Sequence, residues 1–150
     1  MNAQSNNLAN PHVASKKDPK MTTESESNNL QRLTEEFFAD ISDRNWEGAL
    51  SRIHPDARAV QNISGQEVNA RDLLISMQGL VESLADFRYE NPRCIVGQGA
   101  VVEQHDVRMT RLDGVEVLLD ICIVLRFNAD GLVIRIDEYL DSGALKPLQK

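Results

Sequence analysis

The stretch that decides the fold is residues 101–141, VVEQHDVRMTRLDGVEVLLDICIVLRFNADGLVIRIDEYLD. It contains three runs rich in aliphatic and β-branched residues, a composition typical of strands. Asp113-Gly114, between the first two runs, favours a tight two-residue turn in which both central residues need a positive φ. Residues 128–131, Asn-Ala-Asp-Gly, supply turn residues between the second run and the third. We therefore predict an antiparallel meander of three strands.

The register expected from two simple turns brings two carboxylates together. It places Asp106 beside Ile121 and Ile121 beside Glu138, and side chains of a strand alternate between its faces, so these residues share one face. The neighbouring row on the same face is Gln104, Ile123 and Ile136. On the central strand this face is unbroken and apolar, and consists of Val117, Leu119, Ile121, Ile123 and Leu125. A core or a pocket is therefore expected against it, with both carboxylates among apolar side chains.

Composition and charge narrow the functional classes. The chain has 150 residues, enough for one domain with a core, and a formal net charge of -7. Basic residues cluster only at Lys16-Lys17, which argues against nucleic-acid binding. No apolar run is long enough to span a membrane, and the N-terminus has no secretory-signal pattern. Two cysteines, Cys94 and Cys122, are too few for a disulfide scaffold and suggest a reducing compartment, so we expect a cytoplasmic protein.

The rest of the chain has the pattern of a polar tail followed by one domain. Residues 1–28 are rich in Asn, Ser, Thr, Lys and Glu and are predicted to be a disordered N-terminal tail, in which Met21 is a second candidate start. Residues 29–150 are predicted to be the domain. The expected helices are 30–44, 46–53 after an Asn45 cap, and 70–84 after an Asn69 cap, with further strands at 57–63 and 87–96 and a helical turn in 142–150. This order predicts an α+β fold in which helices cover one face of a curved sheet.

This order of elements, together with Glu103–Val107 (EQHDV) and Arg135–Asp141 (RIDEYLD), resembles the NTF2-like superfamily over residues 30–148. Within that superfamily the chain is similar to SnoaL-like domain proteins of the limonene-epoxide-hydrolase-like and polyketide-cyclase-like branch. The resemblance implies a cystatin-like cone, in which a strongly curved antiparallel sheet carries three N-terminal helices on its concave face. It also implies a cone-shaped pocket, no cofactor and a homodimer.

The functional motifs of this family map onto three positions. The limonene-epoxide-hydrolase branch has an aromatic-x-Asn motif on its first strand, which Asn62 matches without the aromatic residue. Its Arg-x-Asp motif on a middle strand is matched by Asp106, with Gln104 in place of the arginine. Its catalytic aspartate on the last strand corresponds to Glu138, as does the acid–base aspartate of SnoaL-like polyketide cyclases.

The predicted face and the resemblance together indicate a hydrophobic pocket for a small molecule. Two carboxylates on an apolar surface take different pKa values, because burial raises both and ionisation of one raises the other. We therefore predict Glu138 and Asp106 as the catalytic pair of a cofactor-independent hydrolase, isomerase or cyclase acting on an apolar substrate. The predicted substrate-binding residues are Asn62, Gln104, Leu119, Ile121, Ile123 and Ile136, and no metal ligand is predicted. Two alternatives stay open, namely a non-catalytic ligand-binding or dimerisation module, and carboxylates that pair with Arg108 or with solvent.

The opposite face of the meander is predicted to form a homodimer interface, because it is too apolar for open water. Its residues in the expected register are His105, Val107, Met109, Leu118, Cys122, Val124 and Tyr139. A second interpretation of this face is a nucleophile or a metal site, since His105, Cys122 and Asp137 form a row there with Asp120 beside them.

The first run of the meander conflicts with the expected register. In the expected register Val101, Val107 and Met109 fall on the outer face, although the hydrophobic alternation of residues 101–109 would place them on the inner face. A one-residue bulge would send Asp106 outward and bring His105 inward, which would make His105 and Glu138 the pair to test. We predict Asp106 inward, because the apolar face of the central strand fixes the partner positions and because the family motif has an aspartate there.

Overall fold

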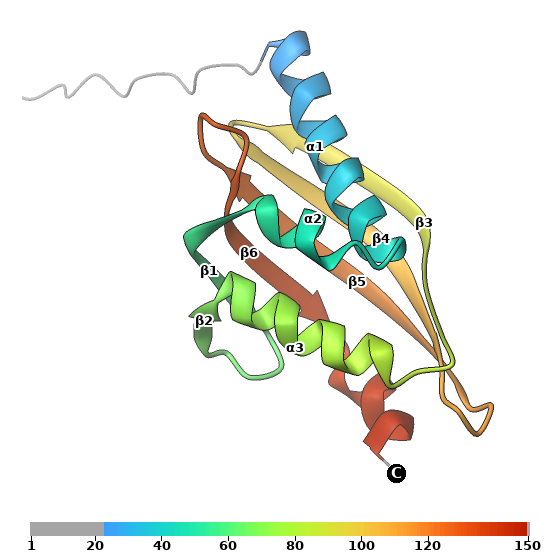
Figure 1. The fold of residues 1–150 in the computed structure, drawn as a ribbon. Helices are drawn as coiled ribbons and strands as arrows, with labels where there is room; N and C mark the ends of the chain where they lie inside the picture. Colours follow the sequence, from blue (N-terminus) through green and yellow to red (C-terminus); the bar gives the residue numbers. More distant parts are fainter. Residues whose placement is uncertain (1–22, 150) are drawn as a thin grey trace, which may run out of the picture.

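The computed structural model describes residues 23–149 and contains a curved, open sheet with helices packed on it (Figure 1). The strand order is β2-β1-β6-β5-β4-β3. Figure 1 shows α1 and α3 lying across one face of the sheet, with α2 between them. The elements are α1 (Glu24–Ser42), α2 (Trp46–Ser51), β1 (Ile53–Gln61), β2 (Glu67–Asn69), α3 (Ala70–Glu82), β3 (Asp86–Gly97), β4 (Ala100–Thr110), β5 (Glu116–Phe127), β6 (Val133–Leu140) and the 3-10 helix η1 (Ser142–Gln149). No helix in this part of the chain is both long and apolar enough to cross a membrane.

The first helix begins earlier than predicted. Its N-cap is Thr23, whose side-chain oxygen accepts a hydrogen bond from the backbone N–H of Glu26 at 3.2 Å. The Glu26 carboxylate in turn accepts one from the backbone N–H of Thr23 at 2.9 Å. This reciprocal capping box satisfies two N–H groups that would lack helical partners, so residues 24–28 are helical and the predicted boundary of the tail is wrong. The remainder of the predicted tail, including Met21, lies outside the described residues.

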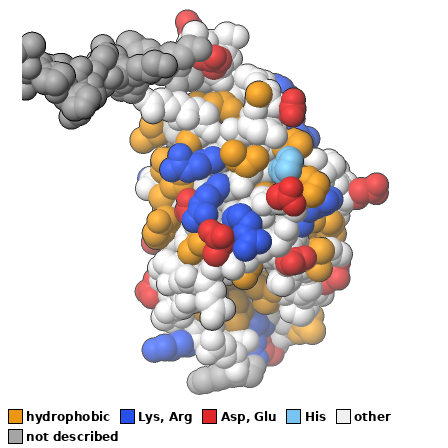
Figure 2. All heavy atoms as spheres, turned by 90° about the vertical axis from the view of Figure 1, so that its left-hand side faces the viewer, with side chains coloured by type: hydrophobic (Ala, Val, Ile, Leu, Met, Phe, Trp, Pro, Cys, Tyr) orange, Lys and Arg blue, Asp and Glu red, His pale blue; other side chains and the backbone are white. Residues whose placement is uncertain are grey.

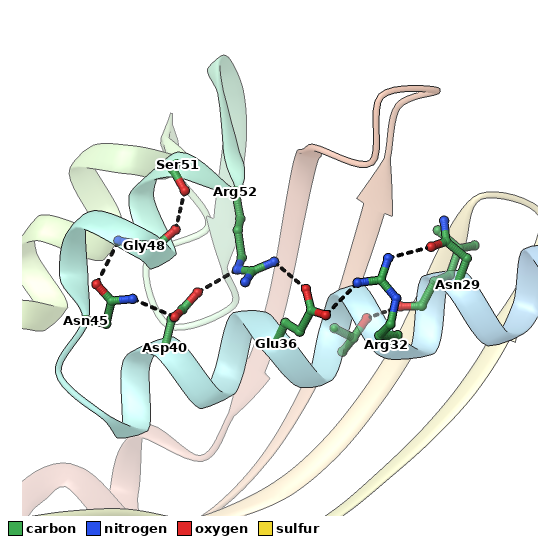
Figure 3. Close-up of polar contacts among 10 residues, drawn as sticks. Asn29, Arg32, Glu36, Asp40, Asn45, Gly48, Ser51 and Arg52 are labelled. Atoms are coloured by element: carbon green, nitrogen blue, oxygen red, sulfur yellow. Dashed lines mark hydrogen bonds and ion pairs between the residues drawn. The ribbon is translucent and has the colours of Figure 1, made fainter.

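An ion-pair network joins α1 to the residue that precedes β1 (Figure 3). Arg52 Nε donates to Asp40 Oδ2 at 2.6 Å, and Arg52 Nη1 donates to Glu36 Oε2 at 2.8 Å. Asn45 extends the network, because its Nδ2 donates to Asp40 while its Oδ1 accepts from the backbone N–H of Gly48 and caps α2 as predicted. The hydrogen bond from Arg52 lowers the pKa of Asp40. The network therefore fixes α2 against α1, which packs on β3 and β4.

The sheet is mixed, which corrects the wholly antiparallel sheet predicted from the sequence. β1 lies beside β6 and runs parallel to it, with Gln61 opposite Glu138. The short strand β2, which the sequence did not predict, pairs with β1 at the edge of the sheet. Turn residues indicate a pairing only between strands that a hairpin connects. Most of the domain lies between β1 and β6, so no turn signal predicts their pairing.

The register of the β4–β5 hairpin differs by one residue from the predicted register. His105 lies opposite Ile121, where the prediction places Asp106. The cause is the turn, because the backbone N–H of Arg111 donates to the carbonyl of Val115 at 2.9 Å and leaves a three-residue loop. Within that loop only Gly114 has a positive φ, 85°, whereas the predicted two-residue turn needs two such residues. A shift of one residue exchanges the faces of a strand, so His105 faces inward and Asp106 outward.

The β5–β6 hairpin is shifted by two residues, which leaves the faces unchanged. Ile123 lies opposite Glu138, and an irregularity in the register falls between Arg126 and Phe127. The predicted apolar face of β5 is buried, with exposed fractions between 0% and 9%: Val117, Leu119, Ile121, Ile123 and Leu125. The inward residues of β4 are buried as well: Val101, Glu103, His105, Val107 and Met109. The core therefore lies between this face and the helices.

The outer face of the meander is more polar than predicted, because three residues of the predicted dimer interface face the core. Those residues are His105, Val107 and Met109, and the ones that remain outside are Leu118, Cys122, Val124 and Tyr139. His105 and Cys122 lie on opposite faces of the sheet, so the predicted row of His105, Cys122 and Asp137 does not form. Within residues 23–149, no three His, Cys, Asp or Glu side chains are grouped as metal ligands.

Charged side chains of both signs intermingle on the face shown in Figure 2, on the side of the molecule where β1 and β2 lie in Figure 1. Glu67 of β2 lies 3.2 Å from Arg58 Nε and 2.7 Å from Arg135 Nη1. Asp137 lies 2.8 Å from Arg135 Nη2, and hydrogen bonds to Asp137 and Glu67 raise the pKa of Arg135. These arginines are therefore paired with carboxylates of β2 and β6.

Candidate functional site

A cavity of about 300 Å³ lies between the inner face of the sheet and helices α1 and α3. Its wall is mostly hydrocarbon and aromatic, and no Arg or Lys of the described chain lines it. Four of the predicted substrate-binding residues line this cavity: Leu119, Ile121, Ile123 and Ile136. The helices contribute Phe37 and Phe38 from α1 and Leu73, Leu74 and Met77 from α3. A pocket of this size and lining suits a small apolar molecule.

Glu138 brings a carboxyl group into this apolar cavity from β6. Gln61, opposite it on β1, donates a hydrogen bond from Nε2 to Glu138 Oε2. Burial raises the pKa of Glu138 and outweighs the hydrogen bond from Gln61 and the charge of His105, which both lower it. The carboxyl group therefore keeps its proton to a higher pH than a carboxyl group in water.

His105 is the second ionisable group of the cavity. It is 2% exposed, and its Nδ1 lies 2.5 Å from Oε2 of Glu103, which is 3% exposed. The two residues are two positions apart on β4 and therefore share its inner face. The other ring nitrogen, Nε2, is buried and has no hydrogen-bond partner within residues 23–149. Buried polar atoms are normally paired, so the unpaired Nε2 is an exception, and it belongs to a residue that lines the cavity.

Aromatic rings enclose the imidazole of His105. Phe38 and Tyr89 contact it edge to face, with ring centroids 5.0 Å and 4.6 Å away. The Tyr89 hydroxyl donates to Met77 Sδ at 4.0 Å, and a thioether is a weak acceptor. Burial, followed by the charges of Glu138 and Glu103, raises the pKa of Tyr89 well above its ordinary value. The phenol is therefore a neutral hydrogen-bond donor that lines the cavity.

Three predicted site residues lie outside the cavity. Asp106 is on the outer face, where its Oδ2 accepts a hydrogen bond from Asn91 Nδ2 at 2.7 Å. Gln104 shares that face because of the same register shift. Asn62 is bound to the backbone of β6, since its Nδ2 donates to the Leu140 carbonyl and its Oδ1 accepts from the Leu140 N–H, both at 3.0 Å. The sheet separates the two predicted carboxylates, which removes the structural basis of the two-carboxylate mechanism.

The sequence holds one signal for the correct inward group. Hydrophobic alternation along β4 puts Val101, Val107 and Met109 on the same face as His105, and this is the arrangement observed. The same alternation applies to Glu103, two positions from His105 on β4, whereas Gln61 carries no such signal, because only the pairing of β1 with β6 brings it to the cavity. Arg108 Nε lies 3.1 Å from Glu90 Oε1, and this hydrogen bond, with a smaller contribution from the charge of Asp106 on the same outer face, raises the pKa of Arg108.

Comparison with known proteins gives a family match over most of the domain. The family model for the SnoaL-like domain matches residues 34–136, whereas no curated protein sequence matches the chain. A candidate hydroxylase, AclR from Streptomyces galilaeus, is 20% identical with a TM-score of 0.71, and the alignment covers 83% of this chain and 87% of that one.

Two further solved structures share the fold. A candidate SnoaL-like polyketide cyclase from Shewanella denitrificans OS-217 is 11% identical with a TM-score of 0.69, and the alignment covers 80% of this chain and 96% of that one. An LEH-like epoxide hydrolase from M. tuberculosis is 14% identical with a TM-score of 0.66, over 81% of this chain and 90% of that one. At these identities the likeness shows the fold alone, and function must be argued from the site.

Proposed function

The chain belongs to the SnoaL-like domain family, and we propose that it is a cofactor-independent enzyme that carries out acid–base chemistry on a neutral, apolar small molecule. Glu138 is the acid and His105 the base. One observation carries the proposal: a carboxyl group with a raised pKa and an unpaired imidazole nitrogen belong to residues that line the same apolar cavity. Proton-transfer catalysis needs an acid and a base with separated proton affinities within reach of one substrate.

The neighbouring polar groups support these roles. Gln61 donates to one oxygen of Glu138 and so fixes the direction in which the carboxyl group points. Tyr89 offers a neutral O–H to a substrate oxygen, at a position where it meets only a sulfur atom among the described residues. No Arg or Lys of the described chain lines the cavity to pair with an anionic substrate, and the apolar wall disfavours a charge. The substrate is therefore an uncharged molecule with one polar function on an apolar body.

Isomerisation of a β,γ-unsaturated ketone is one reaction that this pair can perform. His105 Nε2 takes a proton from the carbon next to the carbonyl group, and the electron pair of that C–H bond forms a carbon–carbon double bond. The carbonyl oxygen takes the proton of Glu138, which gives an enol. Return of the enol proton to Glu138, with delivery of the His105 proton to another carbon of the conjugated system, gives the isomer and restores both residues.

Hydrolysis of an epoxide uses the same two groups. His105 Nε2 takes a proton from water while the water oxygen bonds to an epoxide carbon. The carbon–oxygen bond of the ring breaks, and its electron pair goes to the oxygen, which takes the proton of Glu138 to give a diol. A proton then passes from His105 to Glu138 through solvent, which resets the site.

The outer face of the sheet supports a proposal of homodimerisation. Leu118 is 49% exposed and Tyr139 is 54% exposed, and with Cys122 and Val124 they form a strip across β5 and β6 that is apolar except for Asp120. Such a strip is more easily explained by a self-complementary contact than by open water. Sedimentation of the wild type and of Leu118→Lys tests this proposal. A wild-type monomer at micromolar concentration would contradict it.

The enzyme proposal is tested with purified full-length protein and a panel of uncharged ketones and epoxides. Glu138→Gln should lower turnover by about 10²- to 10⁴-fold, because it removes the transferable proton at nearly constant volume. Asp106→Asn is the matched control, since it makes the same change of carboxylate to amide on the outer face and should leave turnover unchanged. Equal losses in both variants would contradict the assignment of Glu138. Binding of apolar ligands with no turnover of any class would favour the non-catalytic module.

A further inference from the structure

We infer that Glu103 is a positioning residue that holds neutral His105 as the Nδ1–H tautomer, so that Nε2 carries the lone pair. The inference rests on the proposed function for its catalytic meaning. The tautomer itself is a property of the protein without substrate and can be observed directly.

The first observation is the isolation of the pair. Glu103 and His105 are 3% and 2% exposed, and Glu103 Oε2 lies 2.5 Å from His105 Nδ1. A buried carboxylate and a buried imidazole at this distance share one proton in a charge-assisted hydrogen bond. Moving the single N–H proton of a neutral imidazole to the carboxylate would leave an imidazolate, a far stronger base than a carboxylate, so the shared proton stays on Nδ1.

The second observation is the state of the other ring nitrogen. A neutral imidazole carries one N–H, so a proton on Nδ1 leaves Nε2 as an acceptor only. Nε2 is the buried side-chain polar atom without a hydrogen-bond partner in residues 23–149. A general base needs such an unprotonated nitrogen, and His105 is among the residues that line the cavity.

The third observation is that the ring is held in one orientation. Phe38 of α1 and Tyr89 of β3 pack edge to face on it, with interplanar angles of 68° and 76°. Rotation of the imidazole, which would present Nε2 to Glu103, has to displace these rings. Once His105 has taken a proton from substrate, the Glu103 carboxylate also stabilises the imidazolium, which is the second function of an orienting carboxylate.

His54 provides a contrast within the same chain. Its Nδ1 accepts a hydrogen bond from the backbone N–H of Asp56 at 3.2 Å, so neutral His54 carries its proton on Nε2. The chain contains 3 histidines, and the remaining one, His12, lies outside the described residues. Neutral His105 and neutral His54 should therefore be opposite tautomers in one sample.

The experiment is long-range ¹H–¹⁵N correlation NMR on the full chain labelled with ¹⁵N-histidine, with signals assigned by His54→Gln and His12→Gln. We expect His105 to show a protonated Nδ1 and an unprotonated Nε2 at neutral pH. Glu103→Leu should move His105 toward the Nε2–H tautomer, and Glu103→Asp should restore part of the Nδ1–H form. Asp120→Asn, an exposed carboxylate on the outer face of β5, is the matched control and should change nothing.

Kinetic constants distinguish this positioning role of Glu103 from a purely structural one. With a substrate in hand, Glu103→Leu should lower kcat by about 10²-fold with little change in KM. Its loss should not add to that of His105→Ala in the double variant, because both act through one group. An Nε2–H tautomer, or an imidazolium, in the wild-type protein at neutral pH would overturn the inference. An Nδ1–H His105 in a protein that turns over no substrate would count against the proposed function and leave the tautomer assignment standing.

Discussion

Replacing Gly79 by alanine should stabilise the domain. Gly79 lies inside α3 at an exposed position, and a Cβ built on it meets nothing within 4 Å outside its own helix backbone. Glycine in a helix interior is less favourable than alanine by about 0.8–1 kcal/mol, mainly because of its larger backbone entropy in the unfolded chain. With no clash to offset this gain, the free energy of unfolding of Gly79→Ala should rise by about 0.5–1 kcal/mol.

The assay is thermal unfolding followed by circular dichroism, with urea unfolding as a second measure. A gain of this size should raise Tm by about 1–4 °C for a domain of this length. Gly131→Ala is the matched control with the opposite sign, because Gly131 has φ 77° and its added Cβ would lie 3.1 Å from Leu33 Cδ1. That variant should lose about 1–2 kcal/mol. A lower Tm for Gly79→Ala would refute the reasoning, since it would show that α3 lacks space on that side.

Three further predictions follow from ionisable and polar groups. Glu138→Gln should melt at a higher temperature than the wild type at about pH 8. Stability from a group with a raised folded pKa is fully present below its unfolded pKa and is lost as the pH rises through its folded pKa. A Tm difference between the two proteins that fails to narrow below about pH 4 would contradict the burial of the charge. Arg52→Met should lower Tm at neutral pH. The Tm difference from the wild type should shrink as the pH falls through the lowered pKa of Asp40, because stability from a carboxyl group with a depressed pKa is lost as the group takes up its proton. A difference independent of pH would show that packing, and not the ion pair, is responsible. Tyr89→Phe should leave Tm nearly unchanged, because its hydroxyl meets only Met77 Sδ among the described residues, but should reduce kcat on a ketone; unchanged kcat would remove Tyr89 from the site.

Local signals in the sequence were sufficient for most of the secondary structure, but not for strand β2 or the start of α1. Asn45 and Asn69 cap the helices that were predicted to follow them, and the strands of the meander lie where alternation and turn residues place them. These features depend on neighbouring residues, so a short window contains the information. The Thr23–Glu26 capping box was also readable, and the polar composition around it concealed the start of α1.

The position of the candidate site depended on one turn. A two-residue and a three-residue loop at Asp113-Gly114 differ little in sequence, yet they exchange Asp106 for His105 on the inner face. The unbroken apolar face of β5 could not decide between them, because it constrains β5 and leaves the register of β4 open. The hydrophobic residues of β4 did indicate the correct register, because burying Val107 and Met109 requires His105 to face inward.

The parallel pairing of β1 with β6 has a kinetic consequence. Gln61 and Glu138 are 77 positions apart, so their contact closes a loop that spans most of the domain. Contacts of such long range carry a large loop-closure entropy and slow the folding of the domains that depend on them. If β1 has not docked, Gln61 cannot donate to Glu138, and β6 is the edge strand of the meander on that side. Burial of Glu138 would therefore report completion of folding. A pH titration of this group during refolding would show when β1 docks on β6.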